Sequence, residues 1–143
     1  MKRTLISLAM FGLLALPAWA DQVVDVRAVS ADGVGDSIGT VTFSDSDEGL
    51  VIKPDFKQIS PGAHGFHIHQ NPSCEPNEKD GKKVAAGAAG GHYDPASSGK
   101  HEGPEGHGHH GDLPTLLAND AGVANQPVVA PRLKLADIRA APS

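Results

Sequence analysis

The feature of this sequence that most restricts its fold is a long segment, residues 71–112, in which hydrophobic alternation disappears. The segment is rich in Gly, Pro, Lys, Glu and His, has almost no aliphatic side chains, and holds five of the eight histidines. A loop of this length is uncommon inside a compact domain, and such a segment is usually functional, disordered, or wrongly assigned as a loop. Because it has no apolar face to bury, cross-linking of its histidines by a metal ion is a physical way to hold it in place.

The residues on either side of this segment show strand patterns. Val24, Val26 and Ala28 alternate with Asp25 and Arg27, which is typical of a half-buried strand. No window shows a helical period, so we expect an all-β chain of antiparallel strands. The strands predicted in this way are residues 22–30, 37–43, 49–56 after an "SDSDEG" turn, 64–70, two short strands within 113–130, and the start of another within 132–139.

The first twenty residues have the pattern of a cleaved secretory signal. Lys2 and Arg3 precede an apolar run, and a small-x-small site ends at Ala20. A membrane anchor is the alternative, but a membrane-spanning helix needs about 20 apolar residues, and this run is shorter. We therefore expect a signal peptide at 1–20 and one domain at 21–143. Cleavage lowers the formal net charge from −5 to −7, since the segment carries two basic and no acidic residues, which argues against a nucleic-acid partner.

Cys74 is the single cysteine of the chain. Proteins exported to an oxidising compartment usually pair their cysteines. The thiol is therefore free, pairs with another molecule, or lacks its partner in this sequence.

The stretch "HGFHIHQ" (64–70) places two imidazoles on one face of an extended segment. His67 and His69 point to one side, and Phe66 and Ile68 to the other. Two such imidazoles can chelate one ion, and imidazole suits copper and zinc. The alternative is a pair of polar residues on the solvent face of a strand.

The run "GGHYDPASSGKHEGPEGHGHHGDLP" supplies further metal ligands. Tetrahedral zinc takes four nitrogen or oxygen ligands, and three histidines with one aspartate would complete that set. The alternative is a solvated histidine-rich tract that binds metals loosely. The candidates in this run are His92, His101, His107, His109, His110 and Asp112.

Five motifs together resemble a known family. "HGFHIHQ", "NPSCEP", "AGGHYDP", "GKHEGPEG" and "H-x-GDLP" follow one another in the order and approximate spacing of bacterial copper/zinc superoxide dismutases. The resemblance runs from about residue 21 to residue 139. It implies an all-β fold, the Greek-key β-barrel or sandwich of that family, with a long metal-binding loop.

The resemblance also assigns roles to the histidines. It makes His67 and His69 copper ligands, and His92 a ligand shared by copper and zinc. The other zinc ligands implied are His101, His109 and Asp112. His64 matches a supporting residue that makes hydrogen bonds and binds no metal. His110 fills the variable position of the H-x-G-D motif and His107 lies just outside it, so both are expected to face solvent or to bind metal adventitiously.

The activity implied is conversion of superoxide to oxygen and hydrogen peroxide in the periplasm. In the family, copper cycles between two oxidation states, zinc is structural, and the shared histidine, here His92, takes up and returns a proton. The expected substrate is superoxide, the expected cofactors are copper and zinc, and the protein is expected to be a monomer or homodimer without a membrane or nucleic-acid partner.

The resemblance further implies parts that have no counterpart in these 143 residues. After "LKLADIR" the family continues with a fourth copper histidine, an arginine at the copper channel, an aspartate linking the two metal shells, and a cysteine that pairs with the one at Cys74. A chain without them is expected to lack about two barrel strands and to be unstable, weakly active or inactive. The alternative function is therefore a non-catalytic copper- and zinc-binding remnant of the family.

Overall fold

The computed structural model describes residues 20–139, so the predicted signal segment, apart from Ala20, lies outside the described residues. Strands dominate this part of the chain, with one short α-helix and one 3₁₀ turn. The elements are β1 (Gln22–Ser30), β2 (Gly33–Ser46), β3 (Gly49–Phe56), β4 (Gly62–His64), β5 (Asn77–Lys79), β6 (Lys82–Val84), η1 (Gly87–Ala89), β7 (Leu116–Ala118), β8 (Val128–Ala130) and α1 (Leu135–Arg139).

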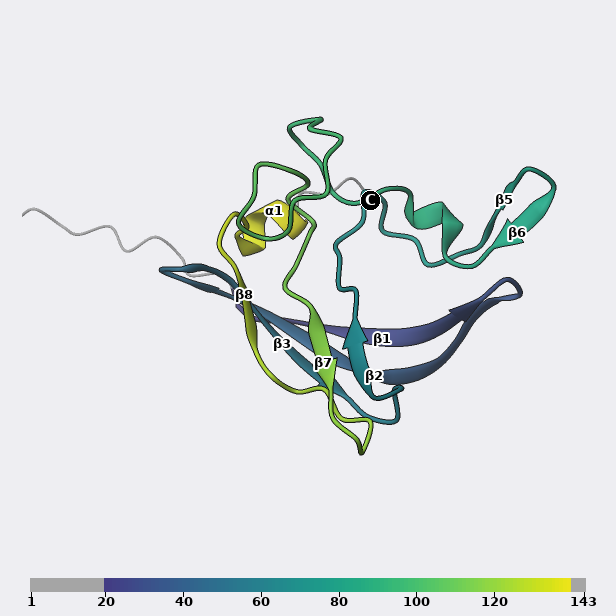
Figure 1. Cartoon of the computed structure of the whole chain (residues 1–143), viewed down its shortest axis with the longest axis horizontal. Coiled ribbons are helices and arrows are strands. Elements are labelled where there is room, and N and C mark those ends of the chain that lie inside the picture. The colour runs from purple at the N-terminus through teal and green to yellow at the C-terminus, as the bar shows by residue number, and fades with distance from the viewer. Residues whose placement is uncertain (1–19, 140–143) are drawn as a thin grey trace, which may run out of the picture.

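Three antiparallel sheets organise these strands. The largest has the order β1-β2-β3-β8, while β4 pairs with β7 and β5 with β6. The chain therefore returns after β7 to place β8 beside β3. In Figure 1 the loops between β6 and β7 lie above the long curved strands, close to α1, and the β5–β6 hairpin projects to one side. The predicted all-β class and the strands at 22–30, 37–43, 49–56 and within 113–130 are confirmed.

The core depends on the alternation of β3. Leu50 and Ile52 are fully buried and Phe56 is 4% exposed, against Val41 of the neighbouring strand β2. Each such side chain contributes about 1.5–3 kcal/mol when it leaves water. Leu116 of β7 joins the same cluster, so burial holds the β4–β7 pair against the large sheet.

The pattern in β1 is only partly reflected in burial. Val26 packs against the core, as the alternation predicts, but Val24 remains 37% exposed and Ala28 is exposed. Val24 and Val26 instead line a cavity of about 510 Å³ that is described below.

The predicted strand at 132–139 is wrong, because Leu135–Arg139 form α1. The Lys134 backbone N–H donates to the Asp137 carboxylate at 2.8 Å, and the Leu135 N–H donates to Asp45 of β2 at 2.7 Å. These bonds satisfy N–H groups at the start of a helix, and Leu135 anchors it in the core with no exposed surface.

At its other end α1 meets the beginning of β1. The Arg139 guanidinium donates to the Gln22 side chain at 3.0 Å and to the Ala20 carbonyl at 2.8 Å. Within residues 20–139 no helix is long and apolar enough to span a membrane.

The segment 71–112 is also more structured than predicted. It contains the β5–β6 hairpin and η1, although the rest is irregular, as expected. Asp80 and Gly81 both have positive φ, 53° and 73°, which is the conformation of a two-residue hairpin turn. The remainder of the segment carries the candidate ligands.

Candidate metal centre

Three stretches of backbone, around residues 68, 92 and 112, hold the candidate ligands together. The Ile68 N–H donates to the Gly111 carbonyl at 2.9 Å, the Tyr93 N–H to the Ile68 carbonyl at 2.8 Å, and the Gly111 N–H to the Tyr93 carbonyl at 2.9 Å. His67 is thereby bridged to Asp112, and His69 to His92. Backbone hydrogen bonds thus bring together residues that are far apart in sequence.

The expected strand at 64–70 is therefore only partly correct. β4 ends at His64, while His67 and His69 form isolated bridges. The reason is that residues 66–70 divide their hydrogen bonds between two partner segments, so neither pairing extends into a ladder. The predicted placement of His67 and His69 on one side nevertheless holds, because both rings contact the ring of His92.

Asp112 is the centre of the first ligand group. The Nδ1 atoms of three histidines surround its Oδ1 atom, at 2.7 Å for His92, 3.0 Å for His101 and 3.4 Å for His109. The aspartate is 1% exposed, whereas the His101 side chain is 59% exposed. The four residues predicted as zinc ligands are thus brought together, with the same ring nitrogen of each histidine directed inward.

Two atoms of this group indicate that it fits a cation. Within residues 20–139, His109 Nδ1 and Asp112 Oδ2 are buried and have no hydrogen-bond partner. Buried polar atoms are nearly always paired, and an unpaired one calls for an explanation. Three nitrogens and one carboxylate oxygen form a donor set suited to zinc, and a bound cation would satisfy both atoms.

The electrostatics of Asp112 favour the ionised carboxylate. Burial is the largest influence and opposes ionisation, but the hydrogen bond from His92 and the attraction of His101 and His109 outweigh it. The pKa of Asp112 therefore lies below its ordinary value of 3.8. The carboxylate is charged, and ready to bind a metal, throughout the physiological pH range.

A second group of candidate ligands, His67 and His69, contacts the ring of His92. The His67 ring stacks on it with centroids 3.9 Å apart and planes 16° from parallel, and the His69 ring meets it edge-on at 5.3 Å. His69 Nδ1 donates to the Gly90 carbonyl at 3.0 Å, which fixes its tautomer and leaves Nε2 free for a metal.

His67 also lies close to the first group. Its ligand atom lies within 4.8 Å of those of His92, His101 and Asp112. Burial, and then the nearby His92, lower the pKa of His67 below 6.5. Its ring is therefore neutral near pH 7, which is the form that binds copper or zinc.

The remaining histidines take no part in these contacts. His64 Nε2 donates to the Ser60 carbonyl at 2.7 Å. The His107 backbone N–H donates to the Glu102 carboxylate, and the His110 ring lies 6.4 Å from that of Tyr93. Cys74 is exposed and unpaired.

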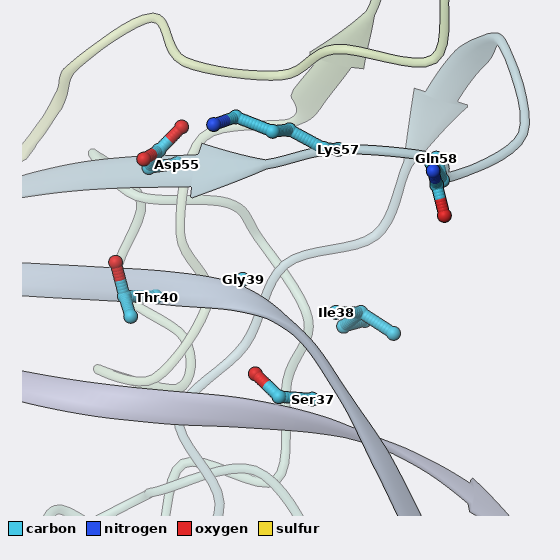
Figure 2. Close-up of a pocket in the computed structure, with 7 residues that line it drawn as sticks. All are labelled: Ser37, Ile38, Gly39, Thr40, Asp55, Lys57 and Gln58. Atoms are coloured by element: carbon cyan, nitrogen blue, oxygen red, sulfur yellow. The ribbon is translucent and has the colours of Figure 1, made fainter.

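Three cavities among the described residues adjoin the long strands. One, of about 510 Å³, is lined by apolar side chains of β1–β3 together with His64, His67 and His69. Another, of about 400 Å³, lies at β2 and β3 and is shown in Figure 2 with Asp55 and Lys57 at its edge. It contains none of the histidines. A third cavity, of about 740 Å³, is lined by β1 together with His69 and Cys74, so this cavity and the first one adjoin the candidate site.

Fold and site together define an all-β protein with a histidine–aspartate metal-binding cluster. Residues 37–141 match the family model described as copper/zinc superoxide dismutase. The chain therefore belongs to the copper/zinc superoxide dismutase family, which confirms the fold class and the enzyme class predicted from its motifs.

Individual relatives agree with this family. Superoxide dismutase (Cu-Zn) 2 of Salmonella typhimurium is 56% identical over 139 residues, which are 96% of this chain and 79% of the relative. The Escherichia coli K12 enzyme is 55% identical over 118 residues, 82% of this chain and 68% of the relative.

Solved structures of the family have the same fold. The Brucella abortus copper/zinc superoxide dismutase superimposes with a TM-score of 0.81 at 51% identity, covering 83% of this chain and 78% of that one. The monomeric Salmonella enterica enzyme gives 0.74 at 57% identity, covering 82% and 77%.

Proposed function

We propose that this chain removes superoxide with a copper ion held by His67, His69 and His92 and a zinc ion held by His92, His101, His109 and Asp112. The observation that carries the proposal is the convergence of three Nδ1 atoms on Asp112 Oδ1. His92 presents Nδ1 to this group, so Nε2, on the opposite edge of its ring, is left for a second metal.

The residues of this chain have separate tasks in the proposed reaction. When bound, copper supplies the one-electron oxidation and reduction that superoxide requires. The Asp112 carboxylate holds His92 through Nδ1 at 2.7 Å and thereby fixes Nε2 as the atom at which a proton can be held. The Gly90 carbonyl orients His69, and the backbone bridges keep His67 and His69 beside the His92 ring.

The proposed location is the periplasm, and the proposed unit is the domain at 21–143 after removal of residues 1–20. The basic, apolar and small-residue order of that segment supports export. The Salmonella enterica relative is described as monomeric, which supports a monomer here. Superoxide is the proposed substrate, as it is for the named relatives.

The ligand sets can be tested one residue at a time. We expect His101→Gln to reduce bound zinc and leave copper, His69→Gln to reduce copper and leave zinc, and His92→Gln to reduce both. His107→Gln is the matched control and should change neither. Metal content per chain is measured by mass spectrometry after loading with both ions and dialysis.

Superoxide removal by the same samples is measured by pulse radiolysis. The proposal expects activity in the loaded wild type and in His107→Gln, and its loss in His69→Gln and His92→Gln. A wild type that binds both metals without removing superoxide would refute the catalytic role and favour the metal-binding alternative. Unchanged zinc in His101→Gln would refute the proposed zinc set.

A further inference from the structure

Arg132 lies at the end of β8, far from the ligands in sequence but close to their loop. Ala130, two positions before it, is 3% exposed, and Leu133, directly after it, is 1% exposed, so buried residues anchor the backbone close to Arg132 on both sides. Its own side chain is half-buried. The guanidinium is directed at residues 103–109, which lie between the proposed zinc ligands His101 and His109.

The guanidinium makes four hydrogen bonds to this loop. Nε donates to the Pro104 carbonyl at 2.9 Å and Nη1 to the Gly108 carbonyl at 2.8 Å. Nη2 donates to the Gly103 carbonyl at 3.0 Å and to the His109 carbonyl at 2.6 Å. One side chain thus joins both arms of the loop, and one of its acceptors is the backbone of a proposed ligand.

The loop has little else to hold it. Two other hydrogen bonds of its backbone, from His109 to Lys100 and from His107 to Glu102, stay within residues 100–109. Two more join its ends to close neighbours in sequence, from the Lys100 N–H to the Ser98 hydroxyl and from the Asp112 N–H to the His109 carbonyl, both at 3.4 Å. Its side chains contribute almost nothing to the apolar cluster of the described residues. Without an external anchor, binding of a metal would have to order the loop at the same time, which weakens binding.

We infer that Arg132 is a positioning residue for the proposed zinc site, holding the loop so that His101 and His109 meet Asp112 before the metal binds. The inference rests on the zinc set proposed above. Arginine suits this task, since its planar guanidinium presents several N–H groups in fixed directions, whereas lysine offers a single nitrogen that cannot reach both arms.

The test measures zinc affinity and metal-free stability separately in the purified chain. Arg132→Met keeps the apolar stem and removes all four hydrogen bonds, and Arg132→Lys keeps the charge. Arg27→Met is the matched control, because Arg27 is exposed and its ion pair with Asp25 is long, at 3.8 Å. Zinc, at up to one equivalent per chain, is titrated against a chromophoric chelator, and stability is measured by urea unfolding with EDTA.

We expect Arg132→Met to raise the zinc Kd by about 10- to 100-fold, the range for residues that support metal ligands. Arg132→Lys should fall between Arg132→Met and wild type, and Arg27→Met should match wild type. Cobalt(II) at the same site should show weaker or shifted visible absorption in Arg132→Met, because its ligand geometry is less well defined.

A zinc Kd within threefold of wild type in Arg132→Met, with only the urea midpoint lowered, would overturn the inference and leave Arg132 a structural residue. If Arg132→Met does not fold, Arg132→Lys decides, and wild-type affinity in that variant is the overturning result. Asp112→Asn separates the two proposals: if it too leaves zinc binding unchanged, the proposed zinc set has failed, whatever Arg132 does.

Discussion

Replacement of Asp112 by asparagine removes the charge on which the proposed zinc set converges while keeping the shape of the side chain. Structural zinc sites bind with about 10–16 kcal/mol from four ligands, so one ligand corresponds to about 2.5–4 kcal/mol. At about 1.4 kcal/mol for each factor of ten, the zinc Kd of Asp112→Asn should rise by about 100- to 1,000-fold. Chelator competition at pH 7 measures this change directly.

The same substitution should weaken the metal-free protein much less. Hydrogen bonds to a charged group contribute about 1.5–3 kcal/mol and neutral ones about 0.5–1.5, so we expect a loss of about 1 kcal/mol. The pKa of Asp112 is lowered by folding, so its stabilisation is present above pH 3.8 and disappears as the pH falls through the folded pKa. The difference between wild type and Asp112→Asn should therefore shrink in acid.

Asp36→Asn is the control, because it makes the same chemical change at an exposed position of β2. It should leave both zinc binding and stability unchanged. A zinc Kd within fivefold of wild type in Asp112→Asn would refute the reasoning, since a carboxylate surrounded by three histidine nitrogens would then not be a ligand. An equal effect of Asp36→Asn would show that net charge, and not the site, controls binding.

Three further predictions follow from burial, packing and pKa. Leu135→Ala should lower the free energy of unfolding by about 2–5 kcal/mol, because Leu135 is fully buried. Leu117 is 63% exposed, so Leu117→Ala should change the free energy of unfolding by less than about 0.5 kcal/mol. Urea unfolding measures both variants. Gly111→Ala would place a Cβ against the Ile68 carbonyl and 2.8 Å from the Tyr93 nitrogen. We therefore expect the free energy of unfolding to fall by about 1–3 kcal/mol and zinc binding to weaken. Wild-type stability and zinc binding in this variant would contradict the packing described. The lowered pKa of His67 stabilises the metal-free fold above pH 6.5, and this stabilisation is lost as the pH falls through the folded pKa. The melting temperature measured in EDTA should therefore fall below pH 6.5, and it should fall less in His67→Asn. An equal fall in that variant would refute the prediction.

Much of the fold and of the ligand group is predictable because its signals are local. The alternation of Leu50, Ile52 and Phe56 marks a strand with one buried face, and the alternation around Ile68 places His67 and His69 on one side. The resemblance of the motifs then assigned the other candidate ligands, which the structure brings together around Asp112.

The features that the sequence did not predict, with one exception, depend on contacts between residues that are distant in sequence. The alternation of Leu133 and Leu135 imitates a strand, and the helix that forms instead begins with an N–H bonded to Asp45, 90 positions earlier. Nothing in the sequence around Arg132 distinguishes it from an arginine that is exposed to solvent. The exception is the β5–β6 hairpin, since the Asp80–Gly81 pair is a recognised turn signal and would have revealed it.

The contacts of α1 have a consequence for the order in which this molecule forms. Arg139 reaches Gln22 across 117 positions and Ala20 across 119. Loop closure over such distances is costly in entropy, and folding slows as contacting residues become more distant in sequence. During synthesis, or during passage through a membrane from the N-terminus, β1 emerges first. Its contacts with Arg139 can form only after nearly all of the described chain has followed. We expect the start of β1, around Ala20 and Gln22, to be among the last parts of the sheet to gain its native contacts, and chaperone binding there to compete directly with them.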